Sequence, residues 1–100
     1  MTELARTDHG EISVSSGALA RLVLQAAEQV EGARVLRPRR SLQVHVEGGS
    51  ARVALELAVR QGVVLPEVSR AVQERVADTL RSMLEVEVEA VDVSIEEIDG

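Results

Sequence analysis

Hydrophobic residues recur at helical spacing in two stretches of the chain. The first covers residues 17–31, and Gly32 follows it where a glycine commonly ends a helix. Its apolar stripe comprises Leu19, Leu22, Val23, Ala26, Ala27 and Val30. The second covers residues 65–84, where Pro66 suits the first turn because its missing N–H would be unpaired there anyway. Its stripe comprises Leu65, Val68, Val72, Val76, Leu80 and Met83.

Between these predicted helices, apolar and polar residues alternate in two stretches, a pattern typical of strands with one buried face. The first stretch is residues 42–47 and the second is residues 51–60. Gly48, Gly49 and Ser50 lie between them and predict a hairpin turn. The polar face of this hairpin comprises Gln43, His45, Glu47, Arg52, Glu56 and Arg60.

Two further strands complete the predicted sheet. Residues 12–14 predict a very short first strand, and without it the sheet has three strands. The last apolar run changes parity near Glu89 and Ala90, as a β-bulge or a strand beginning at Ala90 would produce. The order β-α-β-β-α-β predicts an α+β two-layer sandwich of the ferredoxin-like, split β-α-β type. Two helices then lie on one face of an antiparallel-rich sheet.

Length and polarity predict one domain. A chain of 100 residues has room for a single core, which we assign to residues 11–98. Residues 1–10 are polar and aperiodic, and we expect a flexible tail there. They lack the apolar centre of a secretion signal, and no apolar run is long enough to span a membrane. We therefore expect a cytoplasmic protein without direct membrane insertion.

Composition excludes several kinds of chemistry. The chain has no cysteine, which removes disulfides, thiol nucleophiles and thiolate metal ligands. It has no aromatic residue, which removes platforms for stacking nucleobases. The formal net charge of −6 disfavours nonspecific binding to DNA or to anionic lipid.

Few residues offer a candidate site. Arg37-Pro38-Arg39-Arg40 is the one basic cluster, and it either anchors a phosphate, a nucleic acid or an acidic partner, or protects a sheet edge. His45 has no second histidine at a metal-ligating spacing. We find no glycine-rich phosphate loop and no nucleophile with a neighbouring base, so we predict no catalytic residue, cofactor or metal. The candidate partner-binding residues are Arg37, Arg39, Arg40, His45, Arg52 and Glu56.

Three segments together resemble the alkaline-shock-protein family of bacterial envelope stress response proteins. The first is residues 10–14, followed by a helix that ends in residues 30–33. The second is residues 61–76, and the third is the closing strand of residues 90–95. Two departures are Gln61, where the family usually has tyrosine, and residues 83–85, which lack the family's glycine.

The resemblance implies a small, non-enzymatic cytoplasmic protein of envelope homeostasis and stress. Such proteins self-associate, or lie at the inner face of the membrane through a membrane-anchored protein partner. Two other hypotheses about the function stay open. One is a small nucleic-acid-binding domain that uses Arg37, Arg39 and Arg40. The other is a small hydrolase that uses glutamates or His45, which would require a concave pocket around these residues.

Overall fold

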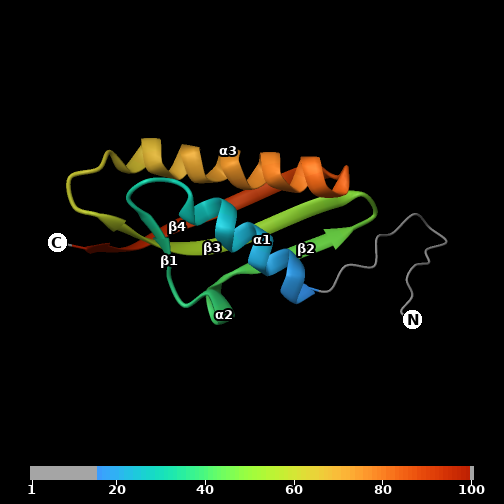
Figure 1. The fold of residues 1–100 in the computed structure, drawn as a ribbon, viewed down its shortest axis with the longest axis horizontal. Helices are drawn as coiled ribbons and strands as arrows, with labels where there is room; N and C mark the ends of the chain where they lie inside the picture. Colours follow the sequence, from blue (N-terminus) through green and yellow to red (C-terminus); the bar gives the residue numbers. More distant parts are fainter. Residues whose placement is uncertain (1–15, 100) are drawn as a thin grey trace.

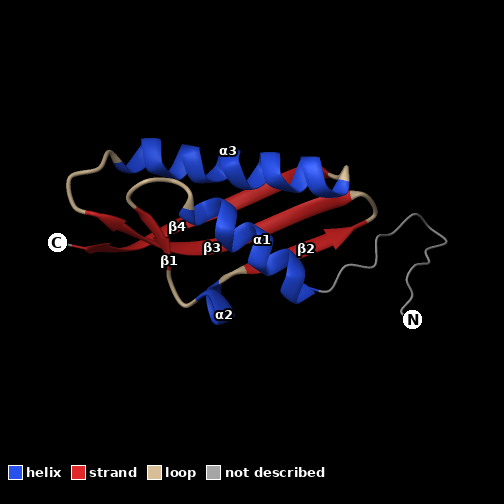
Figure 2. Ribbon diagram, viewed as in Figure 1, coloured by secondary structure: helices blue, strands red, loops and turns tan. Residues whose placement is uncertain are grey.

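The chain folds into two layers, a sheet and two helices that cover one of its faces (Figures 1 and 2). The computed structural model describes residues 16–99. The helices are α1 (Ser16–Glu28), the one-turn α2 (Pro38–Ser41) and α3 (Leu65–Leu84). The strands are β1 (Ala33–Val35), β2 (Gln43–Glu47), β3 (Ser50–Arg60) and β4 (Glu87–Asp99).

β3 is the central strand and pairs with every other strand of the sheet. β4 runs parallel to it along its whole length. β1 and β2 both run antiparallel to it, opposite residues 57–59 and 50–54, so they share the edge that β4 leaves free. A parallel pair of neighbouring strands needs a crossover connection, and α3 supplies it.

The predicted α+β two-layer sandwich is confirmed, and residues 16–99 contain a four-stranded sheet arranged in three rows, one strand more than the three predicted in the absence of residues 12–14. β1 and β2 together make one row, β3 the second and β4 the third. In this part of the chain β3 and β4 are direct neighbours, with no strand inserted between them. The predicted first strand at residues 12–14 and the tail at residues 1–10 lie outside the described residues.

The sequence predicted α3 at its observed boundaries, whereas α1 is shorter than predicted. After Glu28 the chain tightens: the N–H of Gln29 is shared between the carbonyls of Gln25 and Ala26, and Val30 donates to a carbonyl three residues back. Gly32 then adopts a φ of +87°, which turns the chain into β1. The prediction missed β1 because three residues are too few for alternation to be recognisable.

The basic cluster Arg37-Pro38-Arg39-Arg40 contributes to α2, a helical turn that the sequence pattern did not predict. Pro38 begins this single turn, and the hydroxyl of Ser41 donates a hydrogen bond to the carbonyl of Leu36 at 2.6 Å. A buried leucine anchors the turn at each end, Leu36 before it and Leu42 after it. One helical turn shows no periodicity, so the pattern could not reveal it.

The core lies between the sheet and the two long helices. The inward row of β3 comprises Ala51, Val53, Leu55, Leu57 and Val59, all buried. From α3 the buried residues are Val68, Val72, Val76, Ala77, Leu80 and Leu84. Leu65 and Met83, which were assigned to the buried stripe, are exposed at the two ends of the helix, and Leu84 is buried instead.

The change of parity in the last strand is a β-bulge, as one of the two sequence readings predicted. β4 begins at Glu87, and Ala51 and Arg52 pair with Val88 and Ala90, so Glu89 is the extra residue. The bulge allows Val88 and Val91 both to face the helices. A second register shift, at Glu96, was not predicted.

Two substitutions in α3 test its buried face. Val72→Asp places an unpaired charge at a fully buried position, so we expect the domain not to fold. Glu74→Ala changes an exposed side chain and should alter the free energy of unfolding by less than about 0.5 kcal/mol. Thermal unfolding followed by circular dichroism distinguishes them, and the reverse ranking would contradict the assigned helix face.

A second pair of variants tests the turn at Gly32. A Cβ at Gly32 would lie 3.0 Å from Val63 Cγ1, whereas a Cβ at Gly62 would meet nothing within 4 Å. Both glycines have positive φ, so both alanine variants carry the cost of the left-handed backbone. Gly32→Ala should therefore be destabilised more than Gly62→Ala in chemical denaturation. Adding Val63→Ala should remove the excess, and equal losses in the two single variants would refute this.

Candidate interaction surface on the open face of the sheet

The face of the sheet opposite α1 and α3 is lined by polar and charged side chains. Since odd-numbered residues of β3 face the helices, its even-numbered residues face away. These are Arg52, Ala54, Glu56, Ala58 and Arg60. Pairing adds residues of the neighbouring strands to the same face, Arg34 of β1, Gln43, His45 and Glu47 of β2, and Ala90, Asp92, Ser94, Glu97 and Asp99 of β4. We call this surface the open face.

Charges are segregated across the open face. The row that contains β1, α2 and β2 carries Arg34, Arg37, Arg39 and Arg40, with Glu47 as its one acidic residue. The opposite row, β4, carries the six acidic residues Glu87, Glu89, Asp92, Glu96, Glu97 and Asp99 and no basic residue. One side of the sheet is therefore predominantly basic and the other is acidic.

Ion pairs link β3 to each of these rows, and one further pair joins the two rows directly. Arg37 Nη2 lies 3.2 Å from Glu56 Oε1, and Arg52 Nε lies 3.7 Å from Glu89 Oε1. Arg34 Nη2 reaches Asp99 Oδ2 at 3.2 Å, across the full width of the sheet. The side chains are more than one-third exposed, so each pair contributes at most about 1 kcal/mol and mainly orients its members.

A shallow hollow of about 310 Å³ lies in the middle of the open face. Ala54 leaves room for it because its side chain is small. Arg40 and Ser41 of α2 border it on one side, and Asp92 and Ser94 of β4 border it on the other. The hollow thus offers both signs of charge and several hydrogen-bonding groups to a visiting surface.

The structure brings together some of the candidate residues predicted from the sequence. Arg40 and Glu56 line the hollow, and Arg37 pairs with Glu56. His45 is the cross-strand neighbour of Arg52 on the same face, and its Nε2 lies 3.1 Å from Glu47 Oε1. Arg39 is exposed on α2 and does not line the hollow.

Several residues of the hollow were not among the predicted candidates, including Ser41, Ala54, Asp92 and Ser94. The alternation of apolar and polar residues in β4 predicts that Asp92 and Ser94 lie on the same face of their strand. Their position opposite α2 depends on the pairing of β4 with β3, which joins segments far apart in the chain.

Arg39 and Arg40 differ from the other arginines of the basic row. Their guanidinium groups form no ion pair within residues 16–99, and both side chains are exposed. They are therefore available to a second molecule without breaking an existing contact.

Metal-ligand clusters and membrane-spanning helices are the two remaining features considered in the described residues. Residues 16–99 contain no group of three or more histidine, aspartate or glutamate side chains arranged to hold a metal ion. In the same part of the chain, no helix combines the length and apolar character needed to cross a bilayer.

Solved structures with the same fold include forms of MamM CTD. A doubly substituted MamM CTD aligns with a TM-score of 0.66 and 23% identity, covering 84% of this chain and 84% of that chain. The copper form of MamM CTD aligns with a TM-score of 0.66 and 23% identity, covering 84% and 77%. At this identity the likeness establishes the shared fold alone.

The sequence itself matches one family model, that of the alkaline-shock-protein family, described as having a cell envelope-related function, over residues 34–99. This span contains two of the three segments on which the resemblance to that family was based, and the match confirms the resemblance. No curated protein matches the chain significantly.

The backbone at Arg37 allows a test of how α2 is held. Arg37 has a φ of +40° and a ψ of +59°, a left-handed conformation that favours glycine. Arg37→Ala and Arg37→Gly both remove the ion pair with Glu56, but only glycine relieves the backbone cost. We expect the glycine variant to be more stable than the alanine variant by about 0.5–1 kcal/mol in urea denaturation. The same difference in a Glu56→Gln background would assign it to the backbone, and equal stabilities would contradict the prediction.

Proposed function

The chain belongs to the alkaline-shock-protein family, whose function is related to the cell envelope, and we propose that it is a non-enzymatic interaction module that self-associates through the open face of its sheet. The proposal extends to a role in envelope stress and homeostasis. It also includes a cytoplasmic location, peripheral at the inner face of the membrane through a membrane-anchored protein partner.

The segregation of charge on the open face is the observation that carries this proposal. In a symmetric dimer both subunits use the same surface. A two-fold axis parallel to the strands would lay the basic row of one copy over β4 of the other. Because β4 carries only acidic charges, this arrangement is electrostatically complementary in both directions.

The exposure of the polar side chains to solvent supports a role other than catalysis. Within residues 17–99 no polar or charged side chain is buried. Catalytic acids, bases and nucleophiles commonly depend on partial burial to shift their protonation equilibria. The groups around the hollow are instead open to solvent, as in a surface that meets another macromolecule. The hydrolase reading therefore receives no support from this arrangement.

Nucleic-acid binding by the arginine cluster is a less favoured reading. The guanidinium of Arg37 is already paired with Glu56, which leaves Arg39 and Arg40. Asp92 lies across the hollow from Arg40, and a phosphate backbone following the surface would meet its negative charge. A protein surface that offers both signs of charge fits better.

The self-association proposal is tested by sedimentation velocity over a series of concentrations at low and moderate salt. Arg39→Glu/Arg40→Glu should weaken association at least tenfold, about 1.4 kcal/mol, because it places acidic residues against β4. Adding Asp92→Arg/Glu97→Arg should restore it by reversing the charges of the opposing row.

Arg70→Glu provides the control, since it changes an exposed arginine of α3 on the other layer of the protein. It should leave association unchanged. A chain that stays monomeric at high concentration would refute self-association. Retardation of RNA or DNA that weakens with added salt would favour the nucleic-acid reading instead.

A further inference from the structure

We propose that the outer edge of β4, with the groove between β4 and α3, binds an extended basic segment of a partner protein as an additional strand. The edge borders the open face, and Asp92 and Glu97 of β4 belong to both, but strand addition at this edge does not require self-association. The partner segment would alternate basic residues with small apolar ones.

The outer edge of β4 is a long row of available backbone groups. β4 has 13 residues, and β3 pairs with only one of its edges. No strand within residues 16–99 pairs with the other edge. An edge of this kind is a template for strand addition, in which main-chain hydrogen bonds provide affinity.

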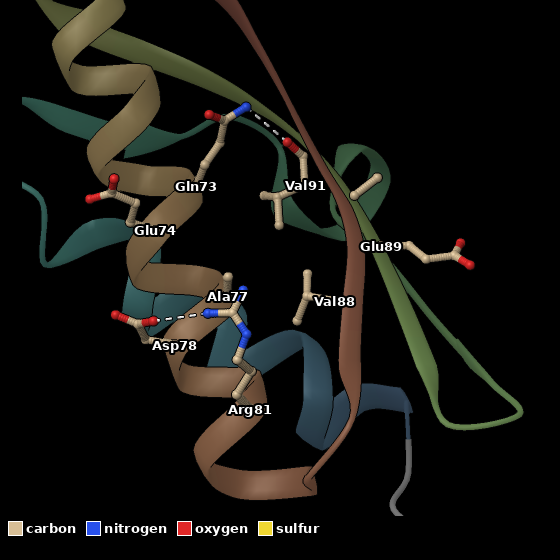
Figure 3. Close-up of a pocket in the computed structure, with 9 residues that line it drawn as sticks. Gln73, Glu74, Ala77, Asp78, Arg81, Val88, Glu89 and Val91 are labelled. Atoms are coloured by element: carbon tan, nitrogen blue, oxygen red, sulfur yellow. Dashed lines mark hydrogen bonds and ion pairs between the residues drawn. The ribbon is translucent and has the colours of Figure 1, made fainter.

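A hydrogen bond from Gln73 shows which backbone groups of β4 point toward its outer edge. Its side-chain Nε2 donates a hydrogen bond to the carbonyl of Val91 at 3.1 Å, across the gap between α3 and β4 (Figure 3). Val91 therefore directs its carbonyl away from β3. Backbone groups alternate in direction along a strand, so Val93 and Ile95 present theirs at the same edge, where no described residue pairs with them.

Next to this edge lies an open groove of about 360 Å³ between α3 and β4. Val88 and Val91 point toward α3, where Ala77 lies opposite them, whereas Glu89 points away (Figure 3). The small side chain of Ala77 leaves the groove open. Since side chains alternate along an added strand, every second one would enter the groove and meet these apolar groups.

The charges around the edge specify a basic occupant. β4 contributes six acidic residues, of which Glu87, Asp92 and Glu97 have no ion-pair partner within residues 16–99. On the α3 side of the groove lie Glu74 and Asp78, and Arg81 is paired with Asp78 at 3.2 Å. Lysines or arginines at alternate positions of an added strand would face this acidic surface.

The same charges disfavour a second copy of the chain at this edge. Pairing β4 with β4 of another molecule would bring acidic side chains opposite one another, which destabilises a strand pair. The acidic residues thus protect the edge from self-pairing and leave it open to a strand of opposite charge. This selectivity is our reason for assigning the edge to a basic partner segment.

Fluorescence anisotropy with the full chain tests the proposal. The probe is a labelled nine-residue peptide of alternating lysine and valine, compared with an alternating glutamate and valine peptide. A third peptide has the lysine–valine sequence with its central valine replaced by proline, which cannot donate a main-chain hydrogen bond. We expect saturable binding of the first, no binding of the second and at least tenfold weaker binding of the third.

Three variants separate strand addition from general charge attraction. Glu74→Arg/Asp78→Arg reverses the charge beside the groove and should weaken binding at least tenfold. Glu31→Arg/Glu47→Arg makes the same change in net charge away from the groove and should weaken it no more than about twofold. Ala77→Leu fills the groove without changing charge and should also weaken binding at least tenfold, with circular dichroism confirming that the variant is folded.

Amide hydrogen exchange gives a readout that is specific to the backbone. Binding of the lysine–valine peptide should slow exchange at Val93 and Ile95. Absence of binding at low salt would overturn the proposal, as would binding that tolerates both Ala77→Leu and the proline peptide. Slowed exchange of the same amides in concentrated protein without peptide would assign the edge to a second copy and would also overturn it.

Discussion

The burial of one face of β3 is the constraint on which the rest of the structure depends. β3 is paired along both edges, and its inward side chains meet α1 and α3. Burying Val53, Leu55 and Leu57 from water is worth roughly 1.5–3 kcal/mol for each side chain. Because side chains alternate along a strand, this burial also fixes which residues face away from the helices. A shift of one residue would expose the core row and bury Arg52 and Glu56.

The open face follows from that constraint. Its width comes from β1, α2 and β2, which share one edge of β3, and from β4, which occupies the other. α2 interrupts the antiparallel row and brings Arg40 to the hollow, while the buried Leu36 and Leu42 hold the turn in place. In this member of a family with an envelope-related function, the open face is thus a charged sheet surface that is accessible to solvent.

β4 belongs to two surfaces at once. Toward the open face it contributes Asp92 and Ser94, and toward α3 it contributes Val88 and Val91. The bulge at Glu89 makes this possible, because it places the valines on either side of it, Val88 and Val91, on the same face of the strand. β4 therefore has an apolar row of side chains that faces the core and an acidic row that faces away from it. The edge of β4 that does not pair with β3 stays unpaired among the described residues.

The sequence by itself determined the elements whose hydrophobic pattern is long enough to repeat. The stripe from Val68 to Leu80 placed α3, alternation placed β2 and β3, and the shift in parity between Val88 and Val91 located the bulge. β1 and α2 are too short to repeat any pattern, so the sequence carries no signal for them. Only the tertiary structure decided that β4 pairs directly with β3, that Asp92 lies across the hollow from Arg40, and that Met83 is exposed. The physical reason is that periodicity reports which side of its own element a residue faces, whereas neighbours across a sheet are set by pairing between segments distant in the chain.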